Sequence, residues 1–133
     1  MGRERALQFL YSLDFTGNDP AVALPAFWAI TDVRPTVRAY AEKLISGVCA
    51  NREELDTSIN AALDNWTPDR VGKIELAAIR IALFEMIYLS DVPASVAINE
   101  AIEVTRNYGS DEAPRFVNGV LDRLRKQLET AQE

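Results

Sequence analysis

Residues 73–89 read KIELAAIRIALFEMIYL, and this stretch decides the fold of the chain. After its first residue the only charged side chains are Glu75, Arg80 and Glu85. A helix that is hydrophobic almost all round is usually the central element of a helical bundle. Because a charged side chain costs free energy to bury, we expect each of the three to reach the rim of the bundle or to find a partner.

The remainder of the chain also has helical character. Apolar residues recur at the i, i+3, i+4 spacing of a helix nearly everywhere, and no stretch shows the alternation of a strand. Further helices are predicted over 3–15, from Pro20, from Pro35, from Asn51, over 95–107 up to Gly109, and over 114–129, with an apolar face on each. We therefore predict an all-α fold, a compact bundle of about seven helices joined by short loops.

Cap and turn residues divide these helices. Asp19-Pro20 is typical of an N-cap followed by a first-turn proline, and Pro25 stands inside the segment that follows, where a proline can split a helix. Asn51 with Glu54 predicts a capping box. Thr67-Pro68 repeats the cap-and-proline pattern behind Trp66, which is expected to face inward. The bundle is expected to comprise two small subdomains, about 1–66 and 67–133.

Composition limits the possible functions. The chain has 133 residues with 48% hydrophobic content, enough for one domain with one core. No apolar run approaches the roughly 18–20 residues that span a bilayer, and the N-terminus does not resemble a secretory signal. We therefore expect a cytoplasmic protein that does not enter a membrane.

The absence of histidine argues against catalysis. With no histidine in the sequence, the Ser-His-Asp and Cys-His arrangements and most zinc sites are excluded. The single cysteine, Cys49, excludes an internal disulfide and lies on an apolar helical face, where we expect a buried core thiol. No glycine-rich phosphate loop is present. We expect a protein that is not an enzyme and that has no cofactor or metal site.

The charges are unevenly distributed along the chain. The net charge is −6, yet residues 1–13 are net +1, residues 14–69 net −5 and residues 104–128 net +2. If the two basic ends meet in the fold, they form a local basic patch on an acidic body. On charge alone, ordinary solvated helix faces are the favoured interpretation.

Aromatic and basic residues gather before and at the start of the last helix. Arg106 and Tyr108 precede a short acidic loop, and Arg115 and Phe116 follow it. Rings that stack on unpaired bases, beside guanidinium groups that contact phosphate, are typical of single-stranded RNA binding. The alternative, favoured without further information, is that both rings only hold the loop against the core.

An asparagine and a glycine stand inside the last helix. A glycine in a helix interior costs about 0.5–1 kcal/mol relative to alanine, so Gly119 is expected to allow a close approach of another element. Asn118 either bonds a neighbouring loop or reads a base edge.

Several motifs together resemble the family of the bacterial transcription antitermination factor NusB. They are IRIALFE at 79–85, DVPASVAINEAIE at 91–103, Tyr108-Gly109 and RFVNGVLD at 115–122. RERALQFLYS at 3–12 is similar to the family's first helix, and residues 40–55 are also similar. The resemblance covers nearly the whole chain, and residues 16–36 match least.

The resemblance implies an all-helical protein that binds RNA with a protein partner. Family members pair with the ribosomal small-subunit protein NusE, bind the boxA element of nascent ribosomal RNA transcripts and join the elongating RNA polymerase complex. The expected RNA-binding residues are Arg3, Arg5, Arg80, Arg106, Tyr108, Glu112, Arg115, Phe116 and Asn118. The expected partner-facing residues are Glu75, Arg80 and Glu85.

Two alternatives to this function stay open. One is an RNA-binding helical domain of the kind attached to RNA cytosine methyltransferases, and the other is a homo-oligomeric helical scaffold, in which a homodimer hides the RNA surface. The leading hypothesis depends on one geometric expectation. Arg3 and Arg5 must lie beside the segment 108–116, and the two rings of that segment must not both be sealed inside the protein.

Overall fold

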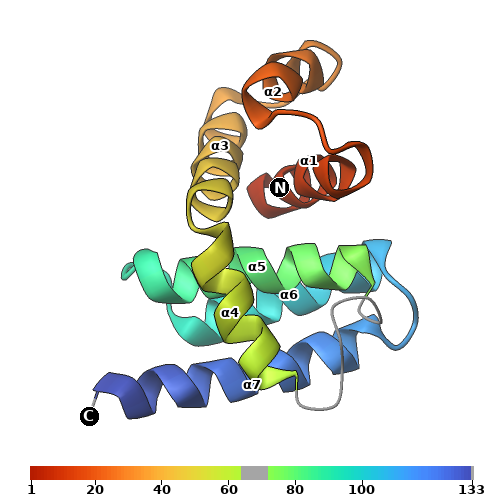
Figure 1. The fold of residues 1–133 in the computed structure, drawn as a ribbon. Coiled ribbons are helices and arrows are strands. Elements are labelled where there is room, and N and C mark those ends of the chain that lie inside the picture. Colours follow the sequence, from red (N-terminus) through yellow and green to blue (C-terminus); the bar gives the residue numbers. More distant parts are fainter. Residues whose placement is uncertain (64–71, 133) are drawn as a thin grey trace.

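The described part of the chain folds into α-helices (Figure 1). The computed structural model describes residues 1–63 and 72–132, and these ranges contain seven helices and no strand. The helices are α1 (Gly2–Thr16), α2 (Pro20–Ala29), α3 (Pro35–Ala50), α4 (Arg52–Ala62), α5 (Lys73–Tyr88), α6 (Ala94–Tyr108) and α7 (Ala113–Gln132). The all-α prediction is confirmed, and each helix begins close to its predicted position.

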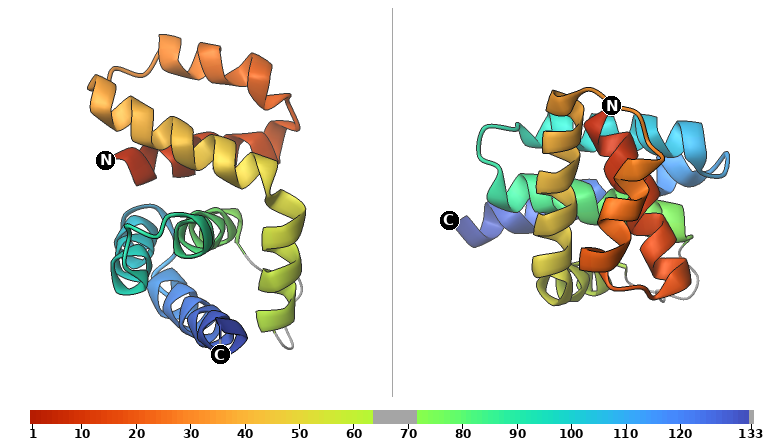
Figure 2. Two further views of the ribbon diagram at one scale, coloured as in Figure 1. Left: turned by 90° about the vertical axis from the view of Figure 1, so that its left-hand side faces the viewer. Right: turned by 90° about the horizontal axis from the view of Figure 1, so that it is seen from above.

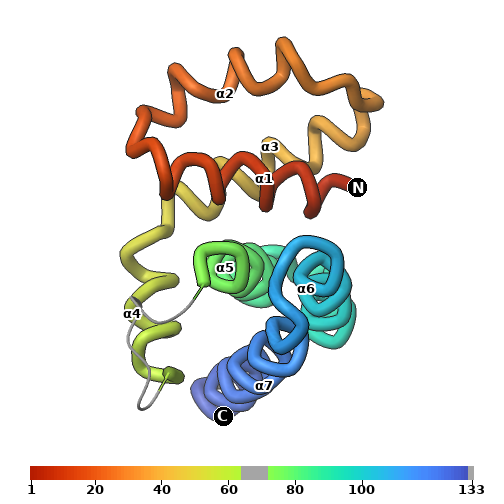
Figure 3. Tube along the Cα trace, turned by 90° about the vertical axis from the view of Figure 1, so that its right-hand side faces the viewer, coloured from red at the N-terminus to blue at the C-terminus, as the bar shows by residue number. Residues whose placement is uncertain are grey.

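Helix α5 lies at the centre of the molecule. It packs against α1, α3, α4, α6 and α7, and every residue from 77 to 85 is buried. Figures 2 and 3 show α1, α2 and α3 stacked above α5, α6 and α7, with α4 descending along one side. The central position predicted for residues 73–89 is confirmed. No helix in the described ranges combines the length and hydrophobicity of a membrane span.

The predicted apolar faces form one continuous core. The largest fully buried apolar side chains come from α1, α3, α4, α5 and α7 and from Leu63 just after α4. Gly47 on α3 allows this packing, because a Cβ there would lie 2.0 Å from the ring of Phe84 on α5. Cys49 is half-buried rather than fully buried, and burial raises the pKa of its thiol.

The second helix differs from its prediction in one respect. The carboxylate of Asp19 accepts a hydrogen bond of 3.0 Å from the amide of Ala21, so the predicted N-cap is confirmed. Pro25, however, does not split the helix, which runs without a break from Pro20 to Ala29. Pro25 and Ala21 are both exposed, so the carbonyl group that loses its helical donor faces water.

The predicted capping box at the start of α4 is wrong. The side-chain amide of Asn51 donates to the carbonyl oxygen of Gly47 over 2.8 Å and so closes the end of α3. Glu54 instead accepts a hydrogen bond of 2.7 Å from the hydroxyl of Tyr88. Asn51 lies between two consecutive helices, and its side chain serves the first of them.

Gly119 also departs from its prediction. A Cβ at this position would meet nothing within 4 Å, so no neighbouring element approaches the helix there. The predicted cap at Thr67-Pro68, the inward-facing Trp66 and the boundary between the two subdomains lie outside the described residues. The division into subdomains stays a prediction.

Candidate binding interface

The first helix and the end of α6 meet at the ring of Tyr108. The side-chain amide of Gln8 approaches the Tyr108 hydroxyl at 3.5 Å, and this hydroxyl donates to Glu4 over 3.3 Å. The Tyr108 side chain remains 39% exposed. Both Gln8 and Glu4 belong to α1, so the first helix lies beside Tyr108. Of the two arginines expected there, Arg5 is joined to this contact through Gln8, whereas Arg3 bonds Glu85.

Arg5 is the arginine of α1 that stays available on this surface. Its Nη1 donates to Gln8 over 3.0 Å, while its Nε is buried and finds no acceptor among the described residues. Since Arg5 is half-buried and forms no ion pair with a carboxylate of the described residues, it is the arginine of α1 whose charge is left uncompensated at this surface.

The other predicted residues of this surface lie around the α6–α7 turn. Arg106 is exposed and forms an ion pair with Glu103 on the same helix. Phe116 is half-buried and packs against the core, which favours the interpretation that its ring anchors the turn. The remaining predicted members are exposed: Glu112, Arg115 and Asn118.

Arg3 and Glu85 occupy a different environment from the one expected. Nε and Nη2 of Arg3 donate to the two carboxylate oxygens of Glu85 over 3.0 and 2.7 Å. Glu85 is fully buried and also accepts a hydrogen bond from the hydroxyl of Tyr40. Burial and this hydrogen bond raise the pKa of Tyr40 to about 12. The prediction that Glu85 faces a partner is therefore corrected. The guanidinium of Arg3, which was predicted to bind RNA, is paired with Glu85 instead.

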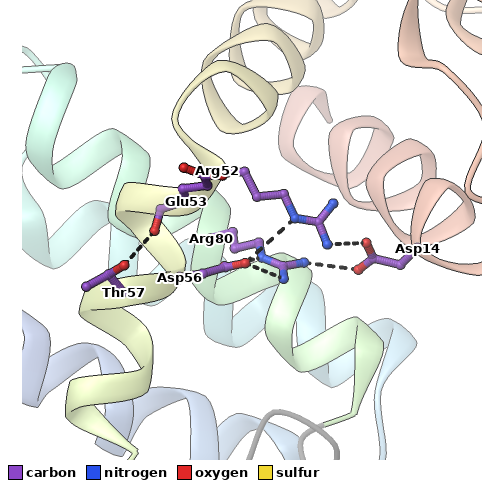
Figure 4. Close-up of polar contacts among 6 residues, drawn as sticks. All are labelled: Asp14, Arg52, Glu53, Asp56, Thr57 and Arg80. Carbon is purple, nitrogen blue, oxygen red and sulfur yellow. Dashed lines mark hydrogen bonds and ion pairs between the residues drawn. The ribbon is translucent and has the colours of Figure 1, made fainter.

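Arg80 is likewise buried, with only 6% exposure. Its guanidinium donates to both carboxylate oxygens of Asp56 over 2.8 and 3.1 Å and to Asp14 over 3.0 Å. Arg52 donates to the other oxygen of Asp14 over 2.6 Å (Figure 4). A charge on an apolar central helix is tolerated here because carboxylates from two other helices surround it. The prediction that Arg80 contacts RNA or a partner is therefore corrected.

A cleft of about 570 Å³ opens beside Tyr108. One wall comes from α1, where the rings of Tyr11 and Phe15 meet edge to face at 5.0 Å. Phe15 is 64% exposed, and Lys73 at the start of α5 places its ammonium group 5.6 Å from the centre of that ring. The lining consists of Tyr11, Phe15, residues 72–76 and residues 108–110.

Glu75, the third charge of the central helix, lies in this cleft between two glycines. A Cβ on Gly72 would lie 1.9 Å from one oxygen of its carboxylate, and a Cβ on Gly109 would lie 3.1 Å from the other. Gly109 has an ordinary negative φ of −99°, so it is required for space rather than for its backbone conformation. The predicted end of α6 at Gly109 is confirmed. Glu75 is half-buried and lines the cleft, and its contact with a partner stays a prediction.

Tyr11, Phe15 and Lys73 were not among the site residues predicted from the sequence. The signal for the first two was an aromatic pair one turn apart on a helix, off the apolar face of Ala6, Phe9 and Leu13. No comparable signal marked Lys73, which joins them only through the fold. In the described ranges no group of three or more carboxylate or cysteine side chains is arranged to hold a metal ion.

The sequence model of the NusB family matches residues 2–126 of the chain. The chain belongs to the NusB family. A NusB transcription antitermination protein from Geobacter sulfurreducens is 38% identical over 131 residues, covering 96% of this chain and 94% of the relative. The function of the chain is therefore that of the family, non-catalytic transcription antitermination.

Solved structures of NusB proteins share this fold. NusB of T. maritima superimposes with a TM-score of 0.83 at 28% identity, covering 94% of this chain and 88% of the other. A chain from the crystal structure of the antitermination factors NusB and NusE with double-stranded RNA gives a TM-score of 0.85 at 27% identity, covering 95% and 94%. The relatives are antitermination proteins matched over most of their length, which favours this function over a domain attached to a methyltransferase.

Proposed function

We propose that the chain binds boxA-type RNA of nascent ribosomal RNA transcripts jointly with the ribosomal small-subunit protein NusE. In this assembly it joins the elongating RNA polymerase complex. One observation carries the proposal. Tyr108 lies on the surface that carries Arg5 and Arg106, and it also lines the cleft. An RNA bound to this surface and a protein bound in the cleft would meet at the ring of Tyr108. The solved complex of a NusB with NusE and RNA supports the same combination of ligands.

The RNA surface that we propose comprises Arg5, Arg106, Tyr108, Glu112, Arg115 and Asn118, with the edge of Phe116. The exposed ring of Tyr108 offers a face for a base, and such stacking is worth about 1–3 kcal/mol per base. The three arginines supply positive charge for phosphates. With about three phosphates contacted, the affinity for single-stranded RNA should fall with salt at a logarithmic slope of about −2.

The partner surface that we propose is the cleft around Glu75. Its lining offers the exposed face of Phe15, a second ring in Tyr11 and a carboxylate held between two glycines. Apolar and aromatic contacts with one well-placed charge are typical of the energetic centre of a protein interface. A basic side chain of the partner beside an apolar one would match this lining.

The test is a titration of fluorescent boxA-type RNA and of a scrambled RNA, each with and without NusE, followed by fluorescence anisotropy. We expect NusE to raise the affinity for the boxA-type RNA about tenfold or more, a usual coupling between two ligands. Glu75→Gln should reduce this gain, while Arg5→Ala should weaken RNA binding with and without NusE. Lys126→Ala, an exposed change near the other end of α7, serves as the matched control. Equal RNA affinity with and without NusE would contradict the proposal.

A further inference from the structure

The two long walls of the cleft come from helices that are far apart in the sequence. Tyr11 and Phe15 belong to the last two turns of α1, and residues 73–76 belong to the first turn of α5. The width of the cleft therefore depends on how the end of α1 is held against α5. Directly after this end, Gly17 takes a left-handed conformation with φ of 68° and terminates the helix.

Asp14 lies on α1 between the two aromatic residues of the wall in sequence, and it is not one of the residues that line the cleft. Its side chain is only 7% exposed, and its two oxygens accept from Arg80 over 3.0 Å and from Arg52 over 2.6 Å. Figure 4 shows these side chains pointing toward one another from α1, α4 and α5. Arg80 sits about two turns along α5 from Lys73, and neither Asp14 nor Arg80 is among the residues that line the cleft.

The arginines are themselves fixed on their other side. Arg80 forms a bidentate ion pair with Asp56, and Nε of Arg52 lies 3.7 Å from the same carboxylate. Two carboxylates and two guanidinium groups thus close a ring that joins three helices. Because a guanidinium is planar and its donors have fixed directions, such a ring sets both distance and orientation.

Apolar packing alone would fix the end of α1 less strictly. The face of Phe9, Leu10 and Leu13 holds α1 onto the core, but the hydrophobic effect is not directional and permits small sliding and rolling of a helix. The ionic ring opposes both movements at the turn that carries Tyr11 and Phe15. Since a buried ion pair contributes little net stability compared with an apolar pair of similar size, stability alone does not account for it.

We propose that Asp14 and Arg80 are positioning residues for the cleft. They hold the aromatic wall of α1 at the spacing from α5 at which the protein partner binds. This inference rests on the proposed function, because it takes the cleft as the site of that partner. Neither residue touches the partner; both act through Tyr11 and Phe15.

The experiment compares Arg80→Met, Arg80→Lys and Arg125→Met with the unchanged protein, each labelled with 3-fluorotyrosine. Arg80→Met leaves Asp14 paired with Arg52, so no carboxylate is stranded in the interior. Arg80→Lys keeps the positive charge but replaces the planar guanidinium with an ammonium group. Arg125→Met removes an arginine of the α7 surface that pairs with Asp122 on its own helix, and it is the matched control.

The first readout is the fluorine NMR spectrum. We expect Arg80→Met to shift the resonance of Tyr11 and to leave that of Tyr40, which bonds Glu85 elsewhere on α5, in place. The second readout is the affinity for purified NusE, which should fall about five- to tenfold in Arg80→Met, less in Arg80→Lys and not in Arg125→Met. Asp14→Asn should reproduce the shift and the loss if Arg80→Met does not fold.

Two results would overturn the inference. One is a folded variant with an unchanged Tyr11 resonance, whatever its affinity, because the wall has then not moved. The other is a shifted resonance with unchanged affinity for NusE. If the unchanged protein itself does not bind NusE, the proposed function fails, and the Tyr11 resonance still decides whether the ionic ring holds the wall.

Discussion

The ion pair between Arg3 and Glu85 ties the start of α1 to the central helix, and its loss has a calculable cost. Glu85 has no exposed surface, and among the described residues its carboxylate accepts hydrogen bonds from the guanidinium of Arg3 and the hydroxyl of Tyr40 alone. Removing one partner of a buried pair usually costs about 3–5 kcal/mol, because a buried charge is left behind. Arg3 is 21% exposed, and the Tyr40 hydroxyl remains, so we expect about 3 kcal/mol for Arg3→Met.

The assay is urea unfolding followed by circular dichroism. Arg3→Met should lower the unfolding midpoint without changing the slope of the transition. Adding Glu85→Gln to Arg3→Met should recover part of the lost free energy of unfolding, because the glutamine amide leaves no unpaired charge in the interior. The RNA affinity of the folded Arg3→Met protein should stay close to that of the unchanged protein. An Arg3→Met protein that unfolds at the same urea concentration but binds RNA as weakly as Arg5→Ala would mean that Arg3 contacts RNA rather than stabilising the fold.

Three further predictions concern single residues. The neutral Tyr40 hydroxyl should stabilise the fold fully below pH 10 and progressively less between pH 10 and 12, because its pKa is about 12 in the folded protein. Unfolding experiments across this range should show a smaller decline in Tyr40→Phe. Gly47→Ala should cost about 1–3 kcal/mol, because its methyl group would overlap the ring of Phe84. Gly119→Ala should stabilise the protein by about 0.5–1 kcal/mol, because nothing crowds that position.

Each of these has a result that contradicts it. An equal decline of stability in Tyr40→Phe and in the unchanged protein would remove Tyr40 as its cause. A Gly47→Ala protein as stable as the original would mean that α3 and α5 do not approach as closely as the structure shows. A destabilised Gly119→Ala protein would mean that another element packs against this position.

Hydrophobic periodicity predicted the fold well, for a physical reason. An apolar stripe specifies which face of a helix is buried, so the seven helices and the central place of residues 73–89 followed from the sequence. Cap residues were less certain guides, because one side chain can serve either of two neighbouring helices. Asn51 fits the start of α4 by its spacing, yet it bonds Gly47 at the end of α3.

The site was predicted in part, because the sequence does not say which charges meet. Arg3 and Glu85 are 82 positions apart, and Arg80 and Asp14 are 66 positions apart. Each single charge on the apolar central helix was expected either to pair with another charge or to reach the edge of the bundle. Only the fold shows which of these happens. Glu75 reached the cleft, whereas Arg80 and Glu85 were paired inside. Charge alone did not require the two basic ends to meet; their proximity was an expectation of the RNA-binding hypothesis, and the structure brings α1 and Tyr108 together.

The most direct test of the account is photo-cross-linking from position 108 in a mixture of the protein, NusE and boxA-type RNA. A photo-reactive amino acid replacing Tyr108 should cross-link to the RNA and to NusE, because the ring lies where the proposed RNA surface and the cleft meet. The same probe at position 126 on α7 should cross-link to neither. Cross-links from position 126 and none from position 108 would contradict the central claim.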